Sequence, residues 1–334
     1  MISQPSIETE YLFALCNPGS EKALKLEAES QTLGWRQSYQ RRGFVTFKAD
    51  APFSIDSLNV ALGTARRLCL SLGKSTTREA AIERIDATQA ASQIHHARFH
   101  DRKMQSIHPD TPAQRPTIGQ LIGTVVELGP TEFWAGIHRH APFLSPDPAG
   151  DAGIAMPAES PSRAWLKLEE AARFFDLEFT ANDIVVELGC APGGVVLALL
   201  NRGASVIGVD PAKMADVVLA SAIPLREAAP RSQAWFFHCR KPAALTSKRD
   251  LGQDVTWFMS DMNQSPEVVL KECARFCKMA PSIRGVLITL KLTELSQVAE
   301  KAQWLASLAA LGFKTQRLQQ LSVHHKEFAL LALK

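Results

Sequence analysis

A stretch of eleven residues near the middle of the chain constrains the fold most. It is the run I-V-V-E-L-G-C-A-P-G-G from Ile184 to Gly194, in which a short apolar segment leads into a turn with three glycines, and a second apolar run follows at residues 195–200. The pattern predicts a strand, a tight turn and a helix. Glycine lets the backbone pass close to a ligand at positive φ, and the first N–H groups of the helix face whatever binds there.

A carboxylate follows at the point where a bound nucleoside needs one. The apolar run A-S-V-I-G-V at residues 204–209 ends in Asp210, sixteen residues after Gly194. The carboxylate of Asp210 can accept hydrogen bonds from the two hydroxyls of a ribose. The strand, glycine turn, helix and second strand together predict the nucleoside-binding half of a doubly wound sheet.

The spacing of the glycines bears on which nucleoside binds. The three glycines are Gly189, Gly193 and Gly194, with Pro192 inside the turn, whereas the dinucleotide fingerprint is G-x-G-x-x-G. A pyrophosphate needs the helix N-terminus presented to it directly, but a ligand without phosphate needs only room and a carboxylate for its ribose. The spacing therefore favours S-adenosylmethionine over NAD. A plain glycine turn in an α/β sheet is the alternative interpretation of this motif.

The length and composition fit a folded protein with two domains. The chain has 334 residues, of which 46% are hydrophobic, and this is enough for a core in each domain. No apolar run in the sequence approaches the ~18 residues that span a bilayer. The N-terminal residues also lack the basic and apolar segments of a signal peptide. We therefore expect a cytoplasmic protein that does not bind a membrane.

The spacing of cysteines and histidines and the net charge of the chain limit which metals and macromolecules it is expected to bind. The six cysteines form no C-x-x-C pair, so we expect reduced, mostly buried thiols. The nine histidines do not supply the paired ligand spacing of a structural zinc site, and no metal site is predicted. A net charge of +3 permits nucleic-acid binding without requiring it.

Residues 1–140 contain both strand-like and helix-like segments. The apolar patterns predict strands at Tyr11–Cys16, Gly43–Phe47, Leu121–Leu128 and Glu132–Ile137, and helices at Glu21–Ser30, Ser57–Leu72 and Arg78–Arg98. These elements predict an α+β domain. The chain then carries five prolines and two glycines between residues 141 and 161. We therefore expect residues 141–159 to be an interdomain linker.

Residues 160–334 predict a second domain in which strands alternate with helices. Ser160-Pro161 is a typical helix start, and an apolar stripe at three- and four-residue spacing follows it. After the glycine turn the predicted elements are strands ending at Cys239, Asp261, Lys291, Leu321 and Leu333, with helices at 265–278 and 295–311. This alternation predicts an α/β fold with a mostly parallel sheet that helices cover on both faces.

Charged side chains stand where several of these strands end or begin. Asp261 and Lys291 each end a predicted strand, Glu327 begins the last one, and Lys167 lies off the apolar stripe of the first helix. Ligands of such sheets bind beyond the carboxyl ends of the strands. Four charges of alternating sign are therefore expected to converge at one edge. Taken singly, each of them is also explained as an ordinary polar residue at a strand end.

Five segments of the sequence resemble the successive motifs of the FtsJ-type ribose 2′-O-methyltransferases. They are S-R-A-W-L-K-L-E from Ser162, E-L-G-C-A-P-G-G from Glu187, S-D-M from Ser260, L-K-L from Leu290 and H-K-E from His325. The lysine, aspartate, lysine and glutamate of that family's tetrad are matched in order by Lys167, Asp261, Lys291 and Glu327. Within the family, the chain is most similar to bacterial large-subunit rRNA enzymes that methylate a cytidine ribose and carry an N-terminal THUMP region.

The resemblance implies a fold, a function and a set of site residues. It implies a Rossmann-like domain at residues 160–334, which uses S-adenosylmethionine to methylate a ribose of 23S rRNA or a large-subunit precursor, and a THUMP-like RNA-binding region in residues 1–140. The tetrad would be catalytic, with Lys291 as the general base. The residues expected to contact the cofactor are Ser162, Glu187, Gly189, Ala191, Pro192, Gly193, Gly194, Asp210 and Asp261.

The sequence also departs from the family pattern. Val195 stands where an aromatic residue is usual, Glu187 stands where aspartate is commoner, and an acid expected after the third strand is missing around Cys239–Lys241. Two alternatives therefore accompany the main prediction. One is a non-catalytic RNA-binding or assembly protein that retains the fold, and the other is a 2′-O-methyltransferase acting on tRNA.

Overall fold

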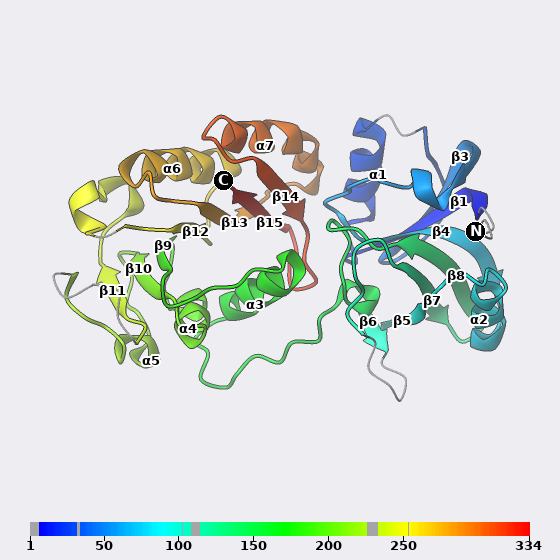
Figure 1. Cartoon of the computed structure of the whole chain (residues 1–334), viewed down its shortest axis with the longest axis horizontal. Helices are drawn as coiled ribbons and strands as arrows, with labels where there is room; N and C mark the ends of the chain where they lie inside the picture. The colour runs from blue at the N-terminus through cyan, green and yellow to red at the C-terminus, as the bar shows by residue number, and fades with distance from the viewer. Residues whose placement is uncertain (1–6, 32–33, 102, 108–113, 226–232, 253) are drawn as a thin grey trace, which may run out of the picture. The chain divides into compact units, whose positions relative to one another are not determined.

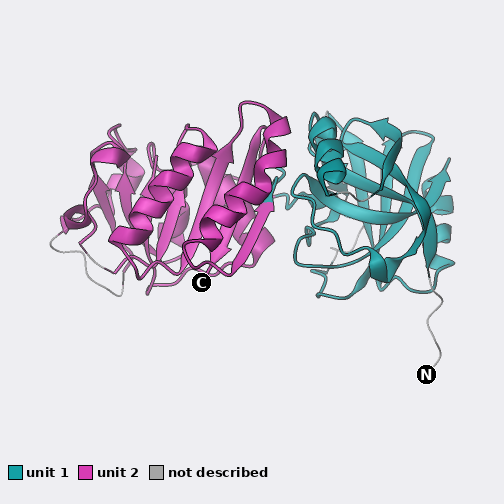
Figure 2. Cartoon of the chain, turned by 90° about the horizontal axis from the view of Figure 1, so that it is seen from above, with its two compact units in different colours: residues 1–153, 319–322 teal, residues 154–318, 323–334 magenta. Residues whose placement is uncertain are grey.

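Two separate β-sheets organise the chain in the computed structural model, which describes residues 7–31, 34–101, 103–107, 114–225, 233–252 and 254–334. One unit consists of Met1–Gly153 and Gln319–Ser322, and the other of Ile154–Leu318 and Val323–Lys334 (Figure 2). They are called the first and second unit below. No helix in the described part of the chain is long and apolar enough to cross a membrane.

The first unit is built on an eight-stranded sheet within the described residues, with strand order β2-β3-β1-β4-β8-β7-β5-β6 (Figure 1). Short 3-10 helices lie at Ile55–Ser57 and Pro148–Gly150. The strands and helices are β1 (Glu8–Cys16), α1 (Glu21–Ser30), β2 (Arg36–Arg41), β3 (Phe44–Ser54), β4 (Ala65–Ser75), α2 (Arg78–Asp86), β5 (Gln93–His100), β6 (Lys103–Ile107), β7 (Leu121–Gly129) and β8 (Glu132–Arg139).

The predicted helix at Ser57–Leu72 is wrong. Its second half, residues 65–72, belongs to strand β4, which pairs antiparallel with β1 and with β8 in the interior of the sheet. Residues 65–71 are all buried, because both faces of this strand are covered. A continuous apolar run satisfies the helical spacing and the strand pattern equally well, and spacing alone cannot separate the two.

The predicted helix at Arg78–Arg98 is correct only in its first half. Helix α2 ends at Asp86, and β5 occupies the second half, parallel to β7. In β5 only His95 and Ala97 are buried, at alternate positions. Polar residues stand at and between these positions, so the sequence shows no clear alternation of apolar and polar residues. Strands β2 and β6 were not predicted either; β2 has five exposed residues out of six and no apolar face to reveal it.

The proline-rich segment after β8 packs into the first unit as far as Gly153. Leu144 and Ala149 are buried. Two buried arginines hold its backbone: Arg67 Nη2 donates to the carbonyl of Asp147 at 2.6 Å, and Arg66 Nε donates to that of Gly150 at 3.1 Å. Contacts with the first unit therefore fix residues 141–153, and the second unit begins at Ile154.

The second unit contains a seven-stranded sheet in its described residues, in the order β11-β10-β9-β12-β13-β15-β14. Short 3-10 helices lie at Ala243–Leu245, Lys248–Asp250 and Leu295–Glu300. The other elements are α3 (Ala164–Phe175), β9 (Ile184–Leu188), α4 (Gly194–Asn201), β10 (Ser205–Val209), α5 (Asp216–Leu219), β11 (Phe236–Cys239), β12 (Trp257–Ser260), α6 (Pro266–Met279), β13 (Gly285–Lys291), α7 (Lys301–Ala309), β14 (Thr315–Gln319) and β15 (Glu327–Leu333).

The mostly parallel α/β sheet predicted for this unit is confirmed. Strands β9 to β13 pair in parallel, and β15 pairs antiparallel with β13. Helices α3 and α4 lie on one face of the sheet and α6 and α7 on the other (Figure 1). The parallel strands bring their carboxyl ends to one edge, and the antiparallel direction of β15 brings its first residue to the same edge.

Helix α3 begins later than the sequence predicts, at Ala164 instead of Pro161. The Ser160 hydroxyl donates to the carbonyl of Ser162 at 3.0 Å and does not cap the helix. A Cβ on Gly194 would lie 2.3 Å from the Ser162 hydroxyl oxygen. Ser162 and Gly194 therefore lie in close contact, and the segment before α3 passes beside the glycine motif.

Candidate active site

A cavity of about 910 Å³ opens at the carboxyl edge of the second sheet. Its walls come from the start of α3, the glycine turn, the segments after β10, β12 and β13, and the residues before β15. Ten of the twelve predicted site residues line this cavity, and Gly193 and Gly194 do not. The ten are Ser162, Lys167, Glu187, Gly189, Ala191, Pro192, Asp210, Asp261, Lys291 and Glu327.

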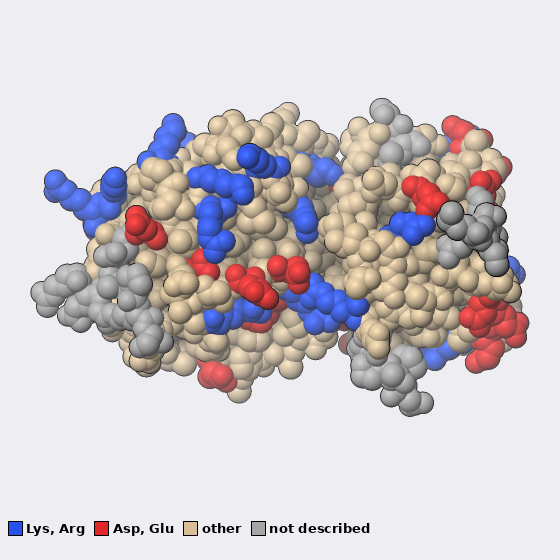
Figure 3. All heavy atoms as spheres, in the orientation of Figure 1, with Lys and Arg blue, Asp and Glu red and all other residues tan. Residues whose placement is uncertain are grey.

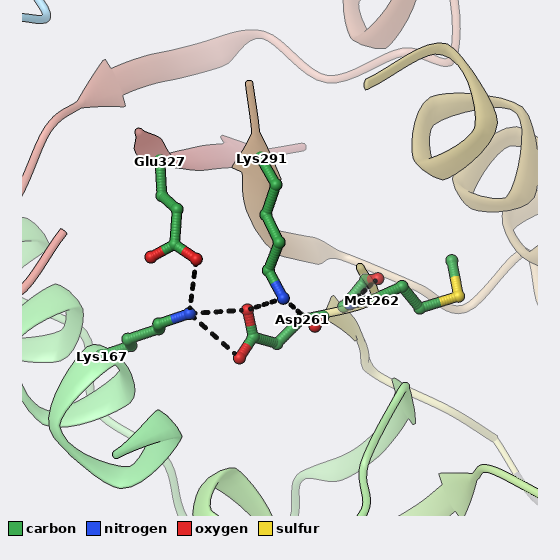
Figure 4. Close-up of polar contacts among 6 residues, drawn as sticks. Lys167, Asp261, Met262, Lys291 and Glu327 are labelled. Carbon is green, nitrogen blue, oxygen red and sulfur yellow. Dashed lines mark hydrogen bonds and ion pairs between the residues drawn. The ribbon is translucent and has the colours of Figure 1, made fainter. Parts of the chain in front are cut away.

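Four charged side chains form a connected network in this cavity (Figure 4). Lys167 Nζ lies 3.0 Å from Asp261 Oδ1 and 3.0 Å from Glu327 Oε1. Lys291 Nζ donates to the backbone carbonyl of Asp261 at 2.8 Å and lies 3.3 Å from Asp261 Oδ1. The tetrad is therefore a chain of ion pairs in the order Glu327, Lys167, Asp261, Lys291.

The backbone explains why these four side chains meet. Lys291 ends β13 and Glu327 begins β15, and the two residues are register partners in that antiparallel pair. Asp261 directly follows β12, the neighbouring strand, and Lys167 reaches over from α3. The four side chains are only 13–21% exposed. Their two positive and two negative charges balance, which limits the cost of burying them.

At each of the three glycines of the turn, an added Cβ would lie less than 3.0 Å from a neighbouring atom. Gly189 has a φ of +75°, and a Cβ there would lie 3.0 Å from Met262 Cα, directly after Asp261. Gly194 allows α4 to pack against the segment before α3. Gly193, at a φ of +116°, faces Val218 and Met214. Gly193 and Gly194 thus shape the turn behind the cavity wall, whereas Gly189 is part of the wall.

Asp210 connects two turns at the rim of the cavity. Its Oδ2 accepts a hydrogen bond from the backbone N–H of Ala191 at 3.1 Å, and its Oδ1 accepts one from Ala212 at 2.8 Å. A carboxylate has about four lone-pair positions. Asp210 is therefore held in place by the backbone and keeps acceptor capacity for a ligand hydroxyl.

Glu187 is a buried acid in the cavity wall. The residue is 2% exposed, and its Oε2 has no hydrogen-bond partner among the described residues. Burial raises the pKa of Glu187 well above its usual value, and the nearby carboxylates of Asp261 and Asp210 raise it further. The side chain therefore favours the neutral, protonated form.

Sequence reasoning missed several residues near the tetrad. Arg163, Asn263 and Lys326 line the cavity, and each is next to or near a motif residue, which was the available signal. His324 is buried, and burial together with the charges of Lys167 and His325 lowers its pKa to about 3. No local pattern marked His324, because its environment comes from residues distant in sequence.

Val195 lies behind the large cavity. It is buried and, together with Lys167 and Glu187, borders a small inner space of about 20 Å³ beneath the tetrad. Such a volume is close to the minimum for one water molecule. Val195 and Glu187 therefore border the same small space.

Part of this unit is similar in sequence to known methyltransferases. Residues 161–300 match the model of the FtsJ-like methyltransferase family. The protein named ribosomal RNA large subunit methyltransferase M of Histophilus somni is 44% identical over 68 residues, which are 19% of this chain and 19% of that protein. The protein of the same name from Ectopseudomonas mendocina is 31% identical over 199 residues, 55% of this chain and 50% of that protein.

These similarities have limits of length and of structural agreement. The matched regions span at most half of the length of the two relatives. Among solved structures, TrmN from Thermus thermophilus is 14% identical, with a TM-score of 0.33 and coverage of 97% of this chain and 99% of that chain. What the comparisons show is a sequence similarity: residues 161–300 of this chain match the FtsJ-like methyltransferase family.

Proposed function

We propose that the chain is an S-adenosylmethionine-dependent RNA methyltransferase that modifies a ribose 2′-hydroxyl of large-subunit rRNA. The observation that carries the proposal is the ion-pair network of Lys167, Asp261, Lys291 and Glu327 inside the cavity of the methyltransferase domain. A polar network of this kind suits proton removal from a hydroxyl. The proposed substrate is 23S rRNA or a precursor of the large subunit.

The cavity fits the proposed cofactor. Ligand cavities in proteins have volumes of roughly 300–1,000 Å³, and this one, at about 910 Å³, lies near the upper end. Asp210 offers a fixed acceptor to ribose hydroxyls, Gly189 brings backbone to the cavity wall, and Glu187 offers an unpartnered carboxyl oxygen. S-adenosylmethionine supplies an electrophilic methyl group on a sulfonium.

The residues of the tetrad have separate tasks in the proposed reaction. A ribose hydroxyl is a poor nucleophile until its proton is removed, and Lys291 in its neutral form accepts that proton at Nζ. The oxygen–carbon bond to the methyl group forms as the carbon–sulfur bond breaks, and the proton then passes from Lys291 to solvent. Lys167 holds Asp261 and Glu327, and Asp261 in turn orients Lys291. The protein thus contributes mainly positioning and proton transfer.

The choice of RNA as substrate is supported by two features. The relatives are named as methyltransferases of large-subunit rRNA. Lys and Arg side chains are also spread over the face of the second unit that Figure 3 shows, around a smaller group of acidic side chains, and RNA phosphates favour such a surface. We propose that residues 1–140 form a THUMP-like RNA-binding region and that the protein acts in the cytoplasm.

Mapping of 2′-O-methyl groups tests the proposed function. Unmodified large-subunit rRNA and tRNA are incubated separately with the protein and S-adenosylmethionine, and the methylated riboses are located by resistance to alkaline cleavage. A new 2′-O-methyl group at one position of the rRNA is the expected result. Methylation of tRNA alone would favour the alternative of a 2′-O-methyltransferase that acts on tRNA. Absence of both methylation and cofactor binding would favour a non-catalytic RNA-binding protein.

A further inference from the structure

The buried carboxyl of Glu187 lines the cavity, and no described Lys, Arg or His side chain forms an ion pair with it. Glu187 lines both the large cavity and the small inner space. Its Oε2 is buried and has no hydrogen-bond partner among the described residues. An unpartnered buried polar atom is costly, and a charged one is far more so. A carboxyl in this position is therefore either protonated, or ionised and paired with a positively charged ligand that binds in the cavity.

The titratable groups around Glu187 come from every neighbouring element. The groups that line the two cavities with it are Arg163 before α3, Lys167 on α3, Cys190 in the glycine turn, Asp210 after β10, Asp261 after β12, Lys291 at the end of β13, His324, His325 and Lys326 before β15, and Glu327 at its start. Burial is the main cause of the raised pKa of Glu187, and the charges of Asp261 and Asp210 further disfavour a third negative charge. Lys167 is already held by Asp261 and Glu327, and the low pKa of His324, about 3, keeps its ring neutral near pH 7.

We propose that Glu187 is the charge-selective residue of the cofactor site: it carries a proton while the cavity holds no cation and releases that proton to solvent when a sulfonium ligand binds. This inference rests on the proposed function, because it takes S-adenosylmethionine as the ligand. No covalent bond other than the carboxyl O–H changes in the step. Binding of the positive ligand and ionisation of Glu187 are then linked.

The linkage gives the site a means of distinguishing the methyl donor from the spent product. The donor carries a positive sulfur, whereas the product, S-adenosylhomocysteine, is a neutral thioether; both retain the same amino acid group. When the positive charge on sulfur disappears, the three carboxyls of Glu187, Asp210 and Asp261 lose part of their compensation. Glu187 then recovers its proton, and the preference of the site for the donor over the product increases.

Calorimetric titration tests the proposal without measuring turnover. S-adenosylmethionine, S-adenosylhomocysteine and methylthioadenosine are titrated into the full chain in two buffers with different ionisation enthalpies, which gives the number of protons released. We expect S-adenosylmethionine to release close to one proton more than either neutral thioether. At pH values below the titration of Glu187 in the free protein, its affinity should rise about tenfold for each pH unit.

Substitution of Glu187 by glutamine assigns the proton to this side chain. Glu187→Gln has the shape of the neutral acid, so the fold is expected to be kept. The variant should lose the extra proton release and bind S-adenosylmethionine about tenfold or more weakly at alkaline pH, with a much smaller change for S-adenosylhomocysteine. Glu169→Gln is the matched control on α3, because Glu169 pairs with Arg202 outside the cavity, and it should behave like the unmodified protein.

The possible failures are distinguishable. Equal proton release with the donor and the product, or an unchanged extra proton in Glu187→Gln, overturns the inference and leaves the proposed function standing. Failure of the unmodified chain to bind S-adenosylmethionine at all overturns the proposed function, and the inference falls with it.

Discussion

Lys291 and Glu327 are register partners on neighbouring antiparallel strands, yet each side chain binds a different partner. Lys291 Nζ lies 3.3 Å from Asp261 Oδ1, and Glu327 Oε1 lies 3.0 Å from Lys167 Nζ. Lys167 thus has two carboxylate partners and Lys291 has one. The network holds Lys167 as a fixed bridge and leaves Lys291 better placed to turn toward an incoming hydroxyl, which is why we assign the base to Lys291.

Replacement of Lys167 should remove the bridge between the two acids. In Lys167→Ala the carboxylates of Asp261 and Glu327 lose their shared cation and repel each other, so the orientation of Asp261 changes. We expect initial rates of RNA methylation to fall about a hundredfold or more. Lys271→Ala, on the exposed surface of α6, is the control and should retain the rate. Unchanged turnover of Lys167→Ala would show that Lys167 does not contribute to catalysis.

Substitution of Gly194 should destabilise the second unit. A Cβ there would lie 2.3 Å from the Ser162 hydroxyl oxygen and 2.9 Å from the Trp165 backbone nitrogen, and such overpacking costs about 1–3 kcal/mol. Urea unfolding of Gly194→Ala should show this loss. Gly129→Ala serves as the control, because a Cβ on Gly129 meets nothing within 4 Å. Equal stability of the two variants would show that the turn before α3 can shift to accommodate the added Cβ at no measurable cost in free energy.

Acid should weaken the second unit through His324. Burial lowers the pKa of His324 to about 3 in the folded chain, below the usual value near 6.5. Folding therefore favours the neutral ring: its contribution is complete above about pH 6.5 and is lost as the pH falls toward 3, by up to about 1.4 kcal/mol per pH unit.

Urea unfolding over this pH range, compared between the unmodified chain and His324→Gln, isolates the contribution of His324. The free energy of unfolding should fall less steeply with acid in the variant. Parallel curves for the two proteins would show that His324 is not the group responsible for the loss.

The sequence predicted the second unit well because its signals are local. Each signal lies within a few residues of sequence: short apolar strands, a glycine turn and the helix start at Ser265-Pro266. The observed strands and helices agree with these signals. The charged residues at the strand ends could be placed at one edge because parallel strands share an edge. The ion-pair partners could not be predicted, since they depend on how α3 lies over that edge.

The first unit was harder to predict for physical reasons. Strand β4 is buried on both faces, and its apolar run imitates a helix. Strand β2 is exposed and polar, and it is held by its pairing with β3 and not by an apolar face of its own. The unpartnered oxygen of Glu187 was likewise invisible, because it depends on three separate segments meeting around one carboxyl.

The proposed reaction requires Lys291 to remove the proton of a ribose hydroxyl. The most direct test measures methyl transfer to large-subunit rRNA by the unmodified chain and by Lys291→Ala, with the dissociation constant of S-adenosylmethionine determined for both proteins. We predict that Lys291→Ala binds the cofactor as the unmodified chain does and forms no detectable 2′-O-methylnucleoside. Turnover of Lys291→Ala at a rate close to that of the unmodified chain would contradict the account.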